Sequence, residues 1–191
     1  MRKTLCISIV FILASFAGVS TLVWNDGSMA MAQMGHHMAD MKMVGSTVEQ
    51  GMEVTLMTAD AETFFLVQGE TVKTVEKRQG DTHHMMVMLT DKEKGWFIAN
   101  TAVWMTIKDA GGKVVFDERL WPMLADRPHY GNNVALPGPG TYTIQVQVGV
   151  PQLARHAPYQ KRWLKPFKVT FPFTYTQGAQ APMHEMPKTH N

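Results

Sequence analysis

Histidine and methionine side chains gather in four short segments of this 191-residue chain, which has 8 His, 16 Met and a single Cys. The segments are Thr82–Leu89, Trp121–Gly131, Arg155–His156 and the N-terminal stretch 33–45. Imidazole nitrogen and thioether sulfur suit copper, and Cu(I) in particular, far better than magnesium or calcium. Ferrous iron accepts imidazole but usually takes oxygen ligands as well. The residue types therefore point to metal binding.

The segment Thr82–Leu89 is predicted to be a β-strand, in which successive side chains point to opposite faces. Alternation puts three candidate ligands on one face: His84, Met86 and Met88. The opposite face carries the side chains that we expect in the core: His83, Met85, Val87 and Leu89. The alternative is that methionine only fills gaps in a hydrophobic core, as it often does.

The other two internal segments are predicted to be loops. Trp121–Gly131 joins two strands and holds Met123 and His129 six residues apart, with Asp126 as the only carboxylate close to that histidine. His156 lies in a long loop between a strand that ends near residue 150 and one that begins near residue 167. Loops on a rigid scaffold often carry ligands, although a single loop histidine is more often merely exposed.

Several other functions lack their residue patterns. There is no Gly-x-Ser-x-Gly elbow, no phosphate-binding glycine loop and no His-Glu-x-x-His helix, and the carboxylates are scattered. The sequence therefore predicts a protein that is not an enzyme. The formal charge is only +2, without a Lys/Arg run, so we expect no nucleic acid partner.

The N-terminus has the pattern of a Sec signal peptide. Arg2 and Lys3 precede an apolar stretch over residues 5–23, and a small-residue cleavage pattern follows at residues 30–32. The prediction is a signal peptide over 1–32 and a periplasmic mature chain; the alternative is a membrane anchor, for which the stretch is near the lower length limit. Cys6 leaves with the signal, so any soft ligand must be a Met thioether.

Residues 49–176 are predicted to form an all-β, immunoglobulin-like sandwich of seven to eight mainly antiparallel strands. The clearest strands alternate apolar and polar side chains over Tyr142–Val148 and Val169–Tyr175, and Asp109–Lys113 has the composition of a hairpin turn. Pro172 predicts that its strand lies at an edge. The flanking segments, a Met/His-rich stretch over 33–48 and the tail 177–191, are predicted to be disordered. Residues 33–45 are either a metal-collecting arm or a linker.

Three stretches resemble one known family. Trp121–Val134 is similar to a Met-Pro-Met…Gly-Pro-His-Tyr-Gly-Ala-Asn segment, and residues 155–168 to an Arg-His-Thr-Asp…Trp-(aromatic)-(Lys/Glu)-Pro-Phe stretch. Glu49–Val54 is similar to the opening strand Asn-Gly-Met-Glu-Ile. These segments belong to the periplasmic iron-transport accessory proteins, which act beside high-affinity iron permeases in bacteria. The resemblance spans about residues 50–176.

The resemblance implies an immunoglobulin-like sandwich, usually a homodimer, that binds copper and is thought to handle iron. The family's metal ligands are the His and Glu of a His-x-Glu strand, a Met, the His of Pro-His-Tyr-Gly and the His of Arg-His. These fall on five positions of this sequence: His84, Met86, Met123, His129 and His156. At position 86 a Met replaces the Glu of the family's His-x-Glu strand. The interval from Met123 to His129 is one residue shorter than in the family. The Asp that follows Arg-His in the family is missing from this chain. Losing carboxylates weakens the case for iron and favours copper, and a thioether at position 86 favours Cu(I).

Three hypotheses follow. The first is a periplasmic protein that binds copper, as Cu(II) or Cu(I), with iron as a second metal, and supports an inner-membrane iron permease. The second is a copper-resistance chaperone or copper buffer with no iron role. The third is a metal-free structural sandwich. Under either metal hypothesis affinity should fall as pH decreases through the range in which histidine titrates, because the ligands bind unprotonated.

Overall fold

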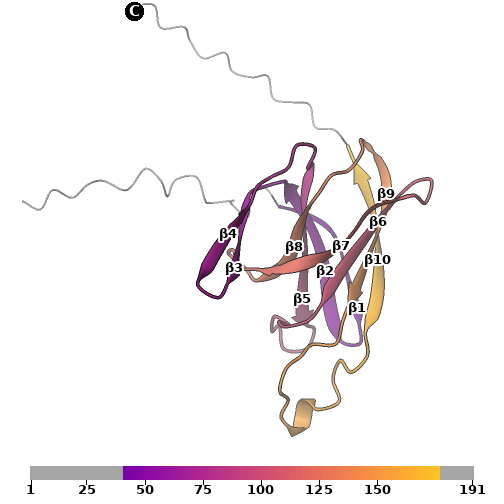
Figure 1. Ribbon diagram of the computed structural model, residues 1–191. Coiled ribbons are helices and arrows are strands. Elements are labelled where there is room, and N and C mark those ends of the chain that lie inside the picture. Colours follow the sequence, from indigo (N-terminus) through magenta and orange to yellow (C-terminus); the bar gives the residue numbers. More distant parts are fainter. Residues whose placement is uncertain (1–40, 177–191) are drawn as a thin grey trace, which may run out of the picture. The chain divides into compact units, whose positions relative to one another are not determined.

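The computed structural model describes residues 41–176, which lie within one compact unit. Within this range the single helical segment is a 3-10 turn, η3 (Ala157–Tyr159). All other regular structure is β-strand (Figure 1): β1 (Lys42–Glu49), β2 (Met52–Asp60), β3 (Phe64–Gln68), β4 (Thr71–Val75), β5 (His83–Asp91), β6 (Val103–Asp109), β7 (Val114–Met123), β8 (His129–Val134), β9 (Gly140–Val148) and β10 (Phe167–Tyr175).

Eight of the described strands form an antiparallel sheet in the order β1-β2-β5-β8-β7-β6-β9-β10, folded into two layers. β7 belongs to both layers, because its first part pairs with β6 whereas Trp121–Met123 pair with β8. The ring of Phe171 in β10 lies over Gly45 in β1, so the two ends of the strand order meet and the sheet nearly closes. β3 and β4 form a separate hairpin beside the sandwich (Figure 1).

The local sequence explains most of these strands. β2 alternates buried and half-buried residues along almost its whole length, as expected for a strand with one face in the core. The turn between β6 and β7 is closed by Asp109, whose carboxylate accepts the backbone N–H groups of Gly111 and Lys113, and Gly112 takes the left-handed conformation there (φ 81°). β10 carries Pro172 and stands at one end of the strand order, so the predicted edge position is confirmed.

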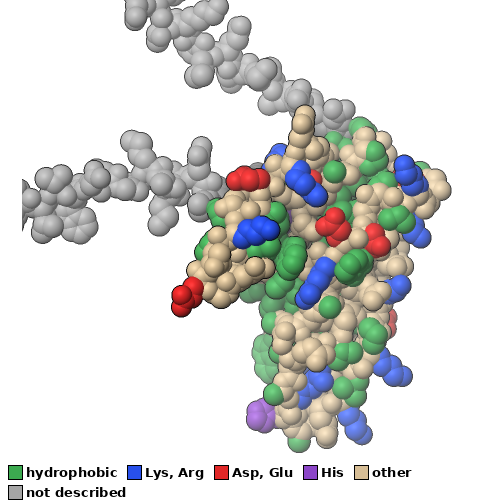
Figure 2. Space-filling model, in the orientation of Figure 1, with side chains coloured by type: hydrophobic (Ala, Val, Ile, Leu, Met, Phe, Trp, Pro, Cys, Tyr) green, Lys and Arg blue, Asp and Glu red, His purple; other side chains and the backbone are tan. Residues whose placement is uncertain are grey.

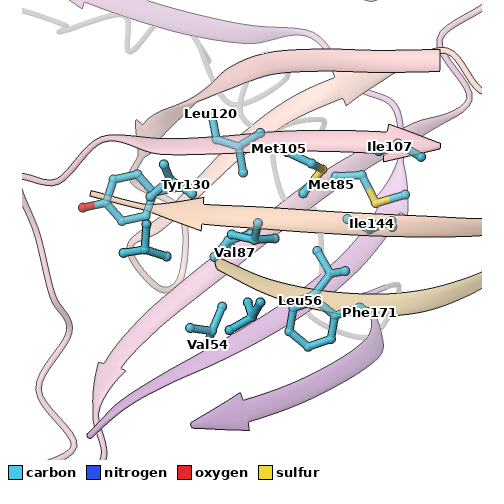
Figure 3. Packing of buried hydrophobic residues seen from close by; sticks show 14 of the residues in the cluster. Val54, Leu56, Met85, Val87, Met105, Ile107, Leu120, Tyr130, Ile144 and Phe171 are labelled. Atoms are coloured by element: carbon cyan, nitrogen blue, oxygen red, sulfur yellow. The ribbon is translucent and has the colours of Figure 1, made fainter. Parts of the chain in front are cut away.

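The core lies between the two layers (Figure 3). Val54, Leu56 and Val87 from one layer meet Ile107 and Ile144 from the other, all fully buried. Burying each such side chain contributes about 1.5–3 kcal/mol. Met85 and Met105 are also fully buried in this cluster, so these two methionines pack the core.

The predicted fold class is confirmed, and two of its details were wrong. The segment expected as a loop, Trp121–Gly131, contains the end of β7 and the start of β8, so His129 stands on a strand. Every residue of β8 is buried, which leaves no period-two pattern to detect in the sequence. The first strand begins at Lys42 within the segment expected to be flexible; it is a half-exposed end strand with few large apolar residues.

Some predictions fall outside residues 41–176: the signal peptide over 1–32, most of the Met/His-rich stretch and the tail 177–191. In the described part of the chain, no helix combines the length and apolar character that crossing a bilayer requires. On the face shown in Figure 2, Lys and Arg side chains are scattered among apolar and uncharged groups rather than gathered in a stripe.

Candidate metal centre

Strand pairing brings the predicted ligands of three strands onto one face of the β5-β8-β7 layer. Met123 in β7 stands directly opposite His129 in β8, and Gly131 in β8 stands opposite Met86 in β5. Residues directly opposite each other in an antiparallel pair point to the same face, as do residues two apart on one strand. His84 therefore shares this face with Met123 and His129.

Gly131 provides the space in which these side chains meet. A Cβ atom at this position would lie 2.7 Å from Nε2 of His84 and 3.1 Å from Sδ of Met123. The two donor atoms are thus no further apart than the sum of these distances, and both lie directly over the glycine backbone. Any larger residue at position 131 would push the imidazole and the thioether away from each other.

His129 lies beside His84 on the same face. The side chain is 7% exposed, and its ring is 6.1 Å from the His84 ring, centroid to centroid, at an interplanar angle of 87°. Its Nδ1 is 3.0 Å from the carbonyl oxygen of Arg127, and since a carbonyl can only accept, Nδ1 carries the proton. Nε2 then holds the lone pair, is buried and has no hydrogen-bond partner among the described residues. A buried acceptor without a partner is costly, and an ion or a water molecule is one way to satisfy it.

His84 is fully buried and is oriented by Asn133, which stands opposite it in β8. The amide nitrogen of Asn133 donates to the carbonyl oxygen of Glu62 (2.6 Å), which fixes the amide so that its oxygen faces Nδ1 of His84 (2.9 Å). Nδ1 is therefore the donor, and Nε2 points its lone pair toward Gly131 and Met123. Holding one imidazole nitrogen in this way is what metal sites do to orient the other.

The surroundings of this cluster are partly apolar. The ring of Phe64, at the start of β3, stands edge-on to the His84 ring at 6.1 Å between centroids. Because Phe64 is itself buried, the β3–β4 hairpin screens His84 from solvent on that side. Asp126, the carboxylate nearest to His129 in sequence, is exposed.

Two predicted ligands are less well placed. Met86 is 3% exposed, lies outside the core cluster and shares the face of His84, but its sulfur is not among the atoms nearest to the Gly131 position. His156 is exposed and precedes η3 in the β9–β10 loop, which extends from the end of the sandwich in Figure 1. That loop is attached to β5 through an ion pair between Arg162 and Asp91.

Asp91 and His84 stand at opposite ends of β5, and a strand rises about 3.3 Å per residue, so they are about 20 Å apart or more. The structure therefore brings together His84, Met123 and His129, places Met86 on the same face, and leaves His156 at the other end of the strand. Within residues 41–176, no three His, Cys, Asp or Glu side chains form a group that could hold a metal ion, so a candidate centre here has to include a thioether.

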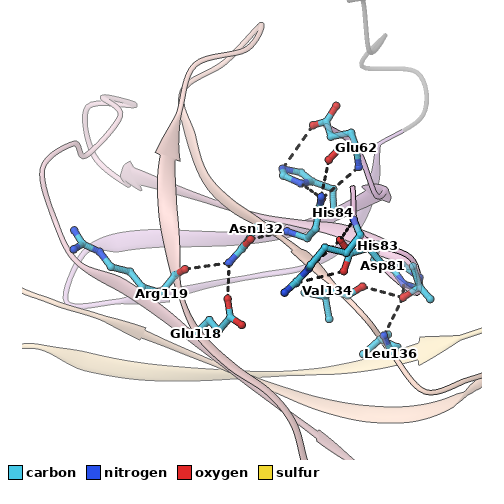
Figure 4. A network of polar contacts seen from close by, with 12 residues as sticks. Glu62, Asp81, His83, His84, Glu118, Arg119, Asn132, Val134 and Leu136 are labelled. Carbon is cyan, nitrogen blue, oxygen red and sulfur yellow. Dashed lines mark hydrogen bonds and ion pairs between the residues drawn. The ribbon is translucent and has the colours of Figure 1, made fainter. Parts of the chain in front are cut away.

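One polar residue near the centre had no signal in the sequence. The carboxylate of Glu62, in the connection from β2 to β3, has its Oε1 atom 3.8 Å from Nε2 of His84 (Figure 4). Its sequence neighbours contain no histidine, and the chain folds back through the β3–β4 hairpin before His84 is reached. Only the pairing of β2 with β5 brings the two side chains together.

The fold and this donor set define an all-β sandwich protein with two imidazoles and a thioether gathered on one face. A family model described as Fe2+ transport protein matches residues 49–177, and the chain belongs to that family. The resemblance inferred from the Pro-His-Tyr-Gly and Trp-x-x-Pro-Phe motifs is thereby confirmed.

Comparisons with individual proteins agree. UPF0423 proteins from Brucella abortus and Brucella suis are 38% identical over 64 residues, a match that covers 28% of this chain and 35% of each relative. The matched segment thus spans about a third of the length of these curated relatives. The solved structure of FetP from uropathogenic E. coli is similar with a TM-score of 0.55 and 22% identity, covering 71% of this chain and 95% of FetP. The copper-reconstituted P19 protein of Campylobacter jejuni gives 0.57 and 22%, covering 71% and 96%.

Proposed function

We propose that this chain is an exported periplasmic protein that binds copper through His84, His129 and Met123, carries iron as a second cargo and supports a membrane iron permease. The observation that carries the proposal is the meeting of the His84 imidazole and the Met123 thioether over Gly131, with the buried His129 ring 6.1 Å from that of His84. Membership of the Fe2+ transport protein family supports the link to iron, and the copper-reconstituted P19 protein supports copper.

The predicted homodimer bears on His156. In one chain this histidine is remote from His84, so it can complete the centre only if a second copy of the chain brings its β9–β10 loop to the site. A ligand role of His156 therefore requires the homodimer.

The copper-resistance alternative is favoured by one observation, the soft side chain of Met86 on the ligand face. It predicts Cu(I) binding without any response to Fe(II). A neighbouring iron permease gene would favour the iron-transport role, and a neighbouring copper ATPase or oxidase gene would favour the alternative.

The test is a calorimetric titration of the mature protein with Cu(II), Cu(I), Fe(II) and Mn(II). His129→Ala should weaken Cu(II) binding at least about tenfold, because it removes a buried nitrogen that no other group replaces. Asp126→Asn, an exposed change in the same β7–β8 connection, is the matched control and should leave the affinity unchanged. Equal Cu(II) affinity in His129→Ala and wild-type protein would remove His129 from the site. A wild-type protein that takes up neither copper nor iron would overturn the proposed function.

A further inference from the structure

Three methionines form a row across the outer face of neighbouring strands. Met43 in β1 stands directly opposite Met57 in β2, and Met57 stands directly opposite Met86 in β5. Since residues directly opposite each other point to the same face, the three side chains lie side by side. We call Met43, Met57 and Met86 the thioether row. It starts on β1, at one end of the strand order (Figure 1), and stops one strand short of Gly131, which stands opposite Met86 in β8.

The thioether row does not fill the core. On β2 the core side chains are those of the other face, such as the fully buried Leu56, and none of the three row methionines belongs to the core cluster. Burial increases along the row: Met43 is 70% exposed, Met57 is half-buried and Met86 is 3% exposed. The row therefore leads from solvent to a buried position.

The spacing of the row suits one soft ion between neighbouring methionines. Cβ atoms of directly opposite residues are about 4.5–5.5 Å apart. Sulfur ligands lie about 2.3 Å from an ion such as zinc, so two of them on one ion are at most about 4.6 Å apart. Methionine has three rotatable bonds beyond its Cα, which lets neighbouring sulfur atoms approach to this distance. Thioether ligands select Cu(I), and the row itself contains no carboxylate or imidazole that would favour a divalent ion.

We infer that the thioether row is a Cu(I) site in its own right, separate from the imidazoles of the candidate metal centre. Met57 is its central ligand, because it has a methionine on each side. Binding by simple coordination changes neither the oxidation state of copper nor any bond of the protein. The inference goes beyond the proposed function and does not need His84 or His129 as ligands. In the sequence, Met43 is the last methionine of the Met/His-rich stretch 33–45, so the exposed end of the row continues that stretch.

The first experiment measures the Cu(I) and Cu(II) affinities of wild-type mature protein and Met57→Leu by competition with a chromophoric chelator. Leucine keeps nearly the volume of methionine and removes the sulfur. Cu(I) affinity should fall at least about tenfold, since even groups that only orient a ligand contribute that much. Cu(II) affinity should stay within about threefold, because Met57 is two strands, or about 10 Å, from Gly131.

The matched control is Met52→Leu, on the core face of the same strand, which should leave both affinities unchanged. An unchanged Cu(I) affinity in Met57→Leu would overturn the inference. An equal loss of Cu(I) and Cu(II) affinity would also overturn it, because Met57 would then only support the fold.

A second experiment asks which thioethers hold the ion. We expect Ag(I), a redox-inert substitute for Cu(I), to shift the nuclear magnetic resonance signals of the Met43, Met57 and Met86 methyl groups. The methyl signals of the core residues Met85 and Met105 should stay in place. Single leucine variants assign the signals. Shifts that spare Met57 and Met86 would overturn the inference.

These outcomes are distinguishable from a failure of the proposed function. If Met57→Leu binds Cu(I) as wild type does while His129→Ala loses Cu(II), the thioether row is excluded and the proposed function stands. If Met57→Leu loses Cu(I) while His129→Ala keeps Cu(II), the row stands and the imidazole centre does not.

Discussion

Two buried polar groups beside β5 differ in how they are hydrogen-bonded. At the far end of the strand, the fully buried carboxylate of Asp91 accepts the backbone N–H groups of Glu93 (2.9 Å) and Lys94 (3.3 Å) and both terminal nitrogens of Arg162 (2.7 and 2.9 Å). Beside the second half of β5, His129 in β8 buries a ring nitrogen that no described residue bonds. The Asp91 carboxylate is satisfied by protein groups, whereas this nitrogen has no partner within residues 41–176.

The electrostatics of the Asp91 end show the same completeness. Burial alone would raise the pKa of Asp91, but the hydrogen bonds from the Glu93 backbone and from Arg162 outweigh burial and lower the pKa below its ordinary value of 3.8. The group is thus held in its charged form as a structural tie for the β9–β10 loop. The Asp91 carboxylate is therefore a structural contact that protein groups satisfy by themselves.

The largest expected effect is on stability, from Arg162→Met. This change leaves the Asp91 carboxylate buried without its cation, which should lower the free energy of unfolding by about 3–5 kcal/mol in urea titrations. Lys92→Met is the control, because the Lys92–Glu53 pair is mostly exposed and should contribute about 1 kcal/mol or less. Copper affinity should stay within about threefold of wild type. A parallel loss of copper binding would contradict the separation of the two ends and bring the loop of His156 into the site.

A smaller effect on stability, joined to a loss of binding, is expected for Gly131→Ala. The added methyl group would contact Nε2 of His84 and Sδ of Met123, so both side chains must move apart. Overpacking of this kind should lower the free energy of unfolding by about 1–3 kcal/mol, and Cu(II) affinity should fall with it. Gly138→Ala places its methyl group in open space and should change neither quantity. Undiminished copper binding in Gly131→Ala would show that the ion does not sit over this glycine.

The smallest effect concerns acid stability. Because the pKa of Asp91 is lowered in the folded protein, the unfolded chain takes up the proton first as pH falls below about 4. Asp91 therefore stabilises the fold fully above that pH, and its contribution is lost as pH decreases through the lowered folded value. Urea titrations of metal-free protein between about pH 4 and pH 2 should show a shallower loss of stability in Asp91→Asn than in wild type. Equal slopes would contradict this tie.

Much of the fold follows from local patterns. The strands β5, β9 and β10 were each predicted close to their observed bounds from the alternation of their side chains. β8 could not be predicted in this way, because all of its residues are buried, including the polar Asn132 and Asn133, and its sequence shows no alternation. β1 was missed because a half-exposed end strand needs few apolar residues.

The sequence by itself determined the chemistry of the donors. The only cysteine lies in the predicted signal peptide. Imidazole and thioether, on strands whose side chains alternate between faces, were therefore the soft ligands that remained. Alternation also fixed which side chains of β5 share a face, because that property depends on the backbone of one strand alone.

Only the tertiary structure decided which donors meet. The register of β5, β8 and β7 puts His84, His129 and Met123 on one face, and the course of the chain after β2 brings Glu62 close to His84. His156 lies in the β9–β10 loop, which is attached to the opposite end of β5 from His84. A sequence motif gives residue types and intervals along the chain. Which side chains lie close together in a β-sandwich is set by long-range pairing between strands. A local pattern therefore contains no information on the distance between residues of different strands.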